Sequence, residues 1–196
     1  MHGPPSPLVE NYLREASFWH VATVGRGCKL YPKLISALIE RWRPETHTFH
    51  LPCGECTITL EDVSLQLGLP VDGKPVTGTA QSSNWEAVCY ELLGAIPDKM
   101  EGERIRYARA YILQIIGGYL MPDTSRSRVH LRWLLKIVDF REAGEFSWGS
   151  AVLATLYREM CGATRPRRAK IRGFLSLLQS WARFRFPFLR PRVDHP

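Results

Sequence analysis

The sequence predicts a mainly α-helical fold, a compact multi-helix domain of about eight helices with one small β-hairpin. Apolar residues recur at helical spacing in most segments, as expected for helices that bury one face. Alternation of apolar and polar residues is confined to residues 46–60, where it indicates paired strands. Because the chain has 196 residues, we expect a single domain over residues 1–196.

Two helices are expected in the N-terminal part. The first begins after Ser6, a suitable capping residue, with Pro7 in its first turn. The second begins at Pro32 and ends before Pro44, because a proline disfavours helical conformation in the residue before it. Their apolar faces are formed by Leu8, Val9, Tyr12 and Leu13 and by Leu34, Ile35, Leu38, Ile39 and Trp42.

A β-hairpin is predicted within residues 46–60, with the four-residue turn PCGE between its strands. The turn region contains a CxxC pair, Cys53 and Cys56, and His47 and His50 lie just upstream. A structural zinc site needs four ligands that converge on one point, and a hairpin with alternating faces would not supply them. A thioredoxin-type motif needs its CxxC at the start of a helix. We therefore predict neither a metal site nor a redox site here.

Further helices are expected after the hairpin. Thr59 and Asp62 have the spacing of a capping box, and Gly68 is suited to end the short helix that follows. Residues 70–83 are rich in Pro, Gly, Ser and Thr and are expected to form a loop. Helical apolar spacing then predicts five helices, near residues 85–92, 105–119, 131–138, 152–160 and 171–181.

Positive charge is concentrated at the C-terminal end, where a basic helix and tail are expected from about residue 158. Residues 1–157 carry 16 Lys and Arg against 17 Asp and Glu, whereas residues 158–196 carry 10 against 2. Such a segment attracts acidic partners, most commonly nucleic acid. A solvated helix face with a tail is the other interpretation, and both remain open. The candidate contact residues are Arg165, Arg167, Arg168, Lys170 and Arg172.

Aromatic residues are interleaved with arginines beyond this segment, around Phe184 and Phe186. Such rings can stack on nucleic-acid bases while the arginines contact phosphates. However, Phe174, Leu178 and Trp181 have the spacing of a core face. We therefore expect the aromatic side chains to lie in the core and the arginines to form an exposed face.

Several function classes lack their sequence signals. The chain contains no GxSxG, no HExxH and no phosphate-binding loop ending in Gly-Lys-Ser/Thr, so no catalytic or cofactor-binding residues are predicted. No apolar run reaches the roughly 20 residues of a membrane span, and no secretory signal precedes the domain. We therefore expect an intracellular protein that does not bind membranes, with its five cysteines reduced.

Four long segments carry a family resemblance: LISALIERWRPETHTFHLPCGECTITLEDVSLQLGLPVDG, RYARAYILQIIGGYLMPD, VHLRWLLKIVDFREAGEFSWGSAVLATLYREMC and LLQSWARFRFPFLRPRVDHP. They closely resemble the plant mobile domain, a transposon-associated family, from about Leu8 onward. The resemblance implies a nuclear plant protein that acts in transposon silencing, gene expression, genome stability and meristem maintenance. It also implies a phosphatase-like partner of the protein phosphatase seven type and no catalytic residues.

Two further expectations accompany the resemblance. The family is also described as aminotransferase-like, but a pyridoxal phosphate enzyme needs a larger α/β fold and a Schiff-base lysine, so we predict no cofactor. The family pattern implies a longer variable insertion near residues 101–107, where Ile105 is followed at once by Arg106. A short natural loop and a removed flexible loop both explain this. We expect the domain to come from a longer protein, and DNA or RNA binding remains the alternative to a protein partner.

Overall fold

The computed structural model describes residues 5–24, 28–76, 92–93, 100–122, 131–164 and 171–190. These residues contain eight α-helices and a three-stranded antiparallel sheet, which confirms the predicted mainly α-helical fold. In chain order the α-helices are α1 (Glu10–Glu15), α2 (Trp19–Val24), α3 (Pro32–Arg41), α4 (Leu60–Leu67), α6 (Met100–Ile115), α7 (Phe140–Gly144), α8 (Trp148–Ala163) and α9 (Leu175–Arg185). The strands are β1 (Trp42–Arg43), β2 (Thr48–Leu51) and β3 (Gly54–Cys56). Shorter turns of 3-10 helix are η1 (Pro7–Val9), η3 (Leu131–Lys136) and η4 (Pro187–Leu189), and η2 (Ile116–Leu120) is a π-helix.

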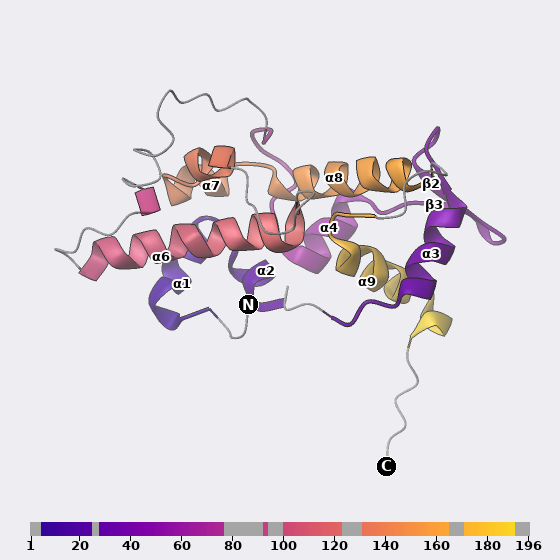
Figure 1. Ribbon diagram of the computed structural model, residues 1–196, viewed down its shortest axis with the longest axis horizontal. Coiled ribbons are helices and arrows are strands. Elements are labelled where there is room, and N and C mark those ends of the chain that lie inside the picture. The colour runs from indigo at the N-terminus through magenta and orange to yellow at the C-terminus, as the bar shows by residue number, and fades with distance from the viewer. Residues whose placement is uncertain are drawn as a thin grey trace, which may run out of the picture.

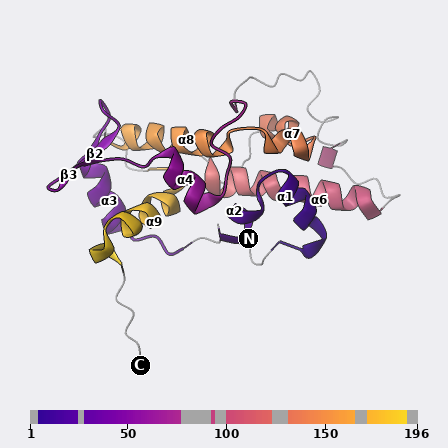
Figure 2. The ribbon, with the colours of Figure 1, turned by 180° about the vertical axis from the view of Figure 1, so that it is seen from behind.

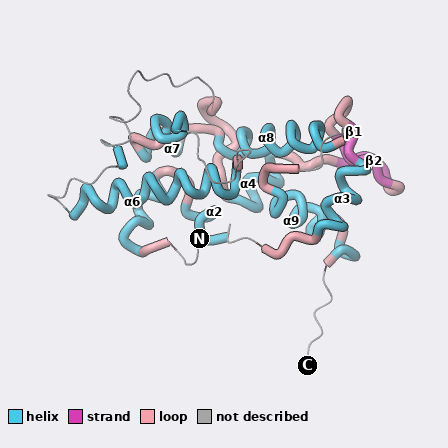
Figure 3. The backbone as a smooth tube through the Cα atoms, in the orientation of Figure 1, coloured by secondary structure: helices cyan, strands magenta, loops and turns pink. Residues whose placement is uncertain are grey.

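Two long helices, α6 and α8, run along the length of the molecule (Figure 1). The sheet and α3 lie at one end, and α1 lies toward the other, as the view from behind also shows (Figure 2). Helix α4 packs on α8, and α9 packs against both α3 and α4. Strands are confined to the end that carries α3 (Figure 3). None of the described helices is both long and apolar enough to cross a membrane.

The first predicted helix is present as η1 followed by α1. The Ser6 hydroxyl oxygen accepts a hydrogen bond from the Leu8 N–H at 3.3 Å, as expected of the capping residue. Val9 and Leu13 are buried as predicted, but Leu8 is 60% exposed, so it does not belong to the buried face. Helices α2 and α7 are additional to the predicted set, because helices of six and five residues are too short to show a periodic apolar pattern.

The predicted hairpin is formed by β2 and β3, and β1 adds a third strand that the alternation does not reveal. Helix α3 ends at Arg41 rather than just before Pro44, because Trp42 turns into the sheet and pairs with Phe49. Only Pro52 and Cys53 form the hairpin turn, since Gly54 already pairs with the opposite strand. The predicted four-residue turn is therefore too long.

The predicted capping box at the start of α4 is confirmed. The Thr59 hydroxyl accepts from the Asp62 N–H at 3.1 Å, and the Asp62 carboxylate accepts from the Thr59 N–H at 2.8 Å. Gly68 follows the last turn with φ of 61°, the left-handed conformation in which glycine ends a helix without steric cost. Both ends of α4 are therefore determined by residues within or next to the helix.

The predicted C-terminal helices are present with shifted ends. Helix α6 passes through residues 101–107 without interruption, and α8 covers the predicted 152–160. The segment predicted as a helix near 131–138 forms the 3-10 turn η3. Helix α9 begins at Leu175 rather than near residue 171, because Gly173 has φ of 89° and breaks helical geometry before it. The helix predicted near 85–92 lies almost wholly outside the described residues.

The core beneath the sheet is aromatic. Trp42 and Trp181 are each 1% exposed, and Phe49 is fully buried between them. The Phe49 ring centroid lies 4.8 Å from that of Trp42 and 5.1 Å from that of Trp181. Phe174 is also buried, so the predicted core positions of Phe174 and Trp181 in the C-terminal segment are confirmed. This packing fixes α9 against the sheet and thereby positions the end of the described chain.

Candidate interaction surface

One of the five predicted basic contact residues lies in the described part of the chain. Arg172 is half-buried just before α9 and lines a shallow pocket of about 240 Å³ with Gly118 of η2 and Ser176 of α9. The structure therefore places one arginine beside the start of α9 and leaves the predicted cluster untested. The remaining four residues, which lie outside the described ranges, are Arg165, Arg167, Arg168 and Lys170.

A second group of basic side chains lies at the opposite end of α9, together with exposed rings. Phe184 is 68% exposed and Phe188 is 81% exposed, which corrects the expectation that the aromatic residues of this segment lie in the core. We call this group the C-terminal aromatic surface. It comprises Tyr31, Arg183, Phe184, Arg185, Phe188 and Arg190.

Hydrogen bonds hold the two parts of this surface together. The Gln179 side chain, which is fully buried, accepts from the Tyr31 N–H at 2.8 Å and donates to the Lys29 carbonyl at 3.0 Å. One helical turn later, the Arg183 guanidinium lies over the Tyr31 ring, 4.7 Å from its centroid. Arg190 donates through Nε to the Arg183 carbonyl at 3.1 Å. The segment before α3, the end of α9 and η4 therefore form one continuous surface.

A chain of rings connects the exposed Phe188 to the core. The Phe186 ring contacts Trp181 edge-on at 6.0 Å between centroids, and its other neighbour is Phe188 at 5.9 Å. Helical spacing identifies Trp181 as a core residue but cannot assign Phe184, which lies off that face, or Phe188, which follows the proline that ends the helix. The sequence signal for both is their position among arginines with no acidic residue nearby.

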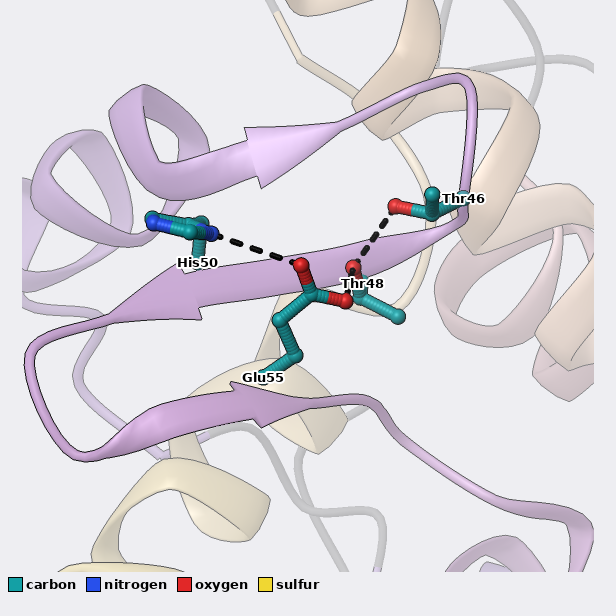
Figure 4. A network of polar contacts seen from close by, with 4 residues as sticks. All are labelled: Thr46, Thr48, His50 and Glu55. Carbon is teal, nitrogen blue, oxygen red and sulfur yellow. Dashed lines mark hydrogen bonds and ion pairs between the residues drawn. The ribbon is translucent and has the colours of Figure 1, made fainter.

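The sheet carries a polar network on exposed side chains (Figure 4). The Thr46 and Thr48 hydroxyls lie 2.7 Å apart, and Thr48 donates to the Glu55 carboxylate at 3.2 Å. His50 Nδ1 lies 3.4 Å from the other oxygen of the same carboxylate. All four side chains face solvent, so the network ties β2 to β3 without forming an enclosed site.

The CxxC pair and its neighbouring histidines do not converge. The His47 ring packs 6.1 Å from Trp42 and 5.5 Å from Tyr157, and so belongs to the aromatic cluster of the sheet. Burial raises the pKa of the Cys56 thiol above its ordinary value of 9.0, and Arg185 opposes this shift. A raised pKa leaves less of the reactive thiolate at neutral pH. Among the described residues, no three His, Cys, Asp or Glu side chains are grouped to hold a metal ion.

The described residues thus define a mainly α-helical domain with a small terminal sheet, whose most exposed rings lie on a basic surface. The plant mobile domain profile matches residues 21–196, most of the chain. The chain belongs to the plant mobile domain family.

Three relatives from Arabidopsis thaliana each contain a region similar to this chain. The chain is 39% identical to the protein MAINTENANCE OF MERISTEMS over 92% of its own length and 42% of the relative's. It is 42% identical to a serine/threonine-protein phosphatase 7 long form homolog over 96% of this chain and 16% of the relative. It is 36% identical to the protein MAIN-LIKE 1 over 92% of this chain and 41% of the relative.

The chain spans less than half the length of each of these relatives. The first two alignments cover 204 and 212 residues, more than the 196 of this chain, so the relatives carry extra residues within the matched region. The shortened loop near 101–107 stays a prediction. No solved structure gives a significant match.

Proposed function

We propose that this chain is a non-catalytic interaction domain that docks a phosphatase-like protein of the protein phosphatase seven type. The observation that carries the proposal is the C-terminal aromatic surface, where Phe184 and Phe188 are exposed beside Arg185. Aromatic and arginine side chains supply most of the binding energy at protein interfaces. The surface therefore has the composition of a docking site.

Support for a phosphatase-related partner comes from one relative. A protein named as a phosphatase 7 long form homolog carries a segment like this chain over 16% of its length. In that relative, the domain and the remaining phosphatase-named chain are covalently linked. In proteins that lack such a link, binding between separate chains would bring the same two components together.

We place the proposed role in the nucleus, in transposon silencing, control of gene expression and genome stability. This part of the proposal rests on membership of the plant mobile domain family. One relative is named for the maintenance of meristems, so we include that process in the proposed role. Fluorescent tagging of the chain in plant cells tests the location, and exclusion of the fusion protein from the nucleus would overturn it.

Nucleic-acid binding is the second candidate function. Its support is the charge distribution, since residues 158–196 carry 10 Lys and Arg against 2 Asp and Glu. Arg172, the last residue of the predicted basic cluster, lies beside the start of α9. Such a segment would contact phosphates rather than read bases.

The decisive experiment for the leading proposal is calorimetric titration of the purified chain with a purified phosphatase-seven-type protein that lacks a plant mobile domain. We expect a one-to-one complex with a dissociation constant of about 1 µM or tighter. An unrelated serine/threonine phosphatase is the matched control and should not bind. Absence of binding at about 100 µM would overturn the docking proposal.

A further inference from the structure

We propose that the C-terminal aromatic surface binds an acidic segment of a partner protein, whose apolar side chains contact Tyr31, Phe184 and Phe188 and whose carboxylates pair with Arg185. This inference rests on the proposed docking function and deepens it. It assigns the surface of the domain that binds and the chemistry of the segment that is bound.

Exposure of apolar side chains is the first step of the argument. Phe188 and Phe184 are the most exposed aromatic side chains in the described part of the molecule, and Tyr31, whose ring lies under Arg183, is 45% exposed. Contiguous apolar groups of this kind on a soluble domain mark interaction sites, because their burial removes unfavourable contact with water. Covering this surface would therefore be favourable.

Charge then determines what covers it. Residues 183–190, at this end of α9, contain three arginines and no acidic residue. The adjoining residues 28–33 add two exposed lysines, Lys29 and Lys33, again with no acidic residue. A basic segment would be repelled here, and a neutral one would gain no attraction from Arg185 and the two lysines. An acidic occupant complements both parts of the surface.

The apolar content favours a protein over a nucleic acid. Arg183 already packs on the Tyr31 ring, and Arg190 is already bonded to the Arg183 carbonyl. Nucleic-acid affinity comes mainly from cations that contact phosphates, and two of the three arginines at this end of α9 are thus engaged within the domain. The three exposed rings of Tyr31, Phe184 and Phe188 instead match the anchors of a protein segment.

The surface is also held in place before anything binds. The bonds from Gln179 fix the backbone at Tyr31, and the contact of Phe186 with Trp181 fixes η4 against the core. A preformed surface loses little conformational entropy on binding, so more of the contact energy appears as affinity. The backbone segments that carry the exposed rings are thus held against the folded domain.

The test uses the full chain and a fluorescein-labelled amphipathic peptide rich in Glu, Leu and Phe, followed by anisotropy. Its matched control peptide has Lys at every Glu position, and a labelled oligo-dT strand is the nucleic-acid probe. We expect the acidic peptide alone to bind, and Phe184→Ala/Phe188→Ala to weaken it about tenfold or more. Leu65→Ala, which removes a 71% exposed side chain from α4, should change affinity less than about twofold.

Folding measurements and a second variant accompany this test. Circular dichroism and thermal melting should match the wild type, because both substituted rings are exposed. Arg185→Glu should also weaken the acidic peptide while leaving the rings intact, which separates the charge contribution from the apolar one. Equal binding of the acidic peptide by wild type and the double alanine variant would overturn the proposal.

If the C-terminal aromatic surface binds something other than an acidic protein segment, the same variants give different results. Oligo-dT binding that disappears in the double alanine variant would assign the surface to nucleic acid, and a dimer that dissociates in the same variant would assign it to a second copy of the chain. Either result overturns the acidic-segment proposal. If the phosphatase does not bind but the acidic peptide does, the proposed partner is wrong and the surface stands. If the phosphatase binds the double alanine variant as tightly as the wild type, the assignment of the binding surface is wrong and the docking function stands.

Discussion

The Tyr157 hydroxyl donates to the Ile58 carbonyl at 2.6 Å and thereby joins α8 to the chain that leads from β3 into α4. The same hydroxyl lies 2.6 Å from that of Thr57, which is also 2.7 Å from the His47 carbonyl. With Tyr157 bonded to Ile58, the Thr57 hydrogen goes either to the Tyr157 oxygen or to the His47 carbonyl, because each hydroxyl has one hydrogen. Tyr157 therefore connects α8 to the segment that follows β3.

Stability at alkaline pH should depend on this tyrosine. Burial raises the pKa of Tyr157 above its ordinary value of 10.0, with a smaller opposing effect from the Thr57 hydrogen bond. A folded pKa above the unfolded one gives a stabilisation that is complete below about pH 10 and is lost as pH rises through the folded pKa. The free energy of unfolding should therefore fall above about pH 10 more steeply in the wild type than in Tyr157→Phe.

Urea unfolding of both proteins across this pH range checks the prediction. At neutral pH we expect Tyr157→Phe to lower the free energy of unfolding by about 1 kcal/mol, because the Ile58 carbonyl loses its donor. The pKa of Lys74 is also raised, by Glu145, but this contribution is common to both proteins and cancels in their difference. Identical pH profiles would show that Tyr157 does not titrate differently in the folded state.

Two glycines should respond in opposite directions to replacement by alanine. Gly73 has φ of 112°, and a Cβ there would clash with the Glu145 carbonyl oxygen. That oxygen accepts the Lys74 N–H at 2.9 Å, so the backbone cannot move away without losing the bond. We expect Gly73→Ala to lower the free energy of unfolding by about 2 kcal/mol or more.

Gly102 is the matched control, because it lies within α6 and a Cβ there meets nothing within 4 Å. Alanine has the higher helix propensity, so Gly102→Ala should raise the free energy of unfolding by up to about 1 kcal/mol. Chemical denaturation of the two variants measures both effects. A similar loss of stability in both would show that backbone geometry at Gly73 is not the cause.

The nucleic-acid candidate predicts binding that depends steeply on salt. The chain would bind short duplex or single-stranded DNA with micromolar or tighter affinity at low salt. The affinity would fall as the salt concentration rises, because the release of counterions from DNA then favours binding less. The variant Arg167→Glu/Arg168→Glu/Lys170→Glu would lose this binding. Fluorescence anisotropy at two salt concentrations measures it, and absence of binding by the wild type at low salt would remove this candidate.

Features that depend on neighbouring residues were predictable. The capping box of Thr59 and Asp62 and the terminating Gly68 lie within ten residues of one another and need no tertiary contact. Helix α8 was predictable because its buried side chains, from Val152 to Met160, repeat at helical spacing over several turns. A long periodic helix has few alternative ways to bury its apolar face.

The end of α3 and the exposure of Phe184 required the folded molecule. Trp42 continues the apolar pattern of α3, yet it leaves the helix because the sheet offers a site between Phe49 and Tyr157. Phe184 is apolar but exposed, because the face of α9 that packs against the core is already filled by Leu178 and Trp181. Periodicity shows that a side chain lies on a given face, but not whether another element covers that face.

For the candidate site too, some features were predictable from the sequence and others depended on the fold. The composition alone placed the positive charge after residue 158, because charge follows directly from residue type. The joining of Tyr31 to Arg183, which are 152 residues apart, depended on the packing of α3 against α9. Local sequence therefore defined the long helices, the caps of α4 and the distribution of charge. Packing between distant segments decided which rings are buried and which remain on the surface, because burial depends on the whole fold rather than on neighbouring residues.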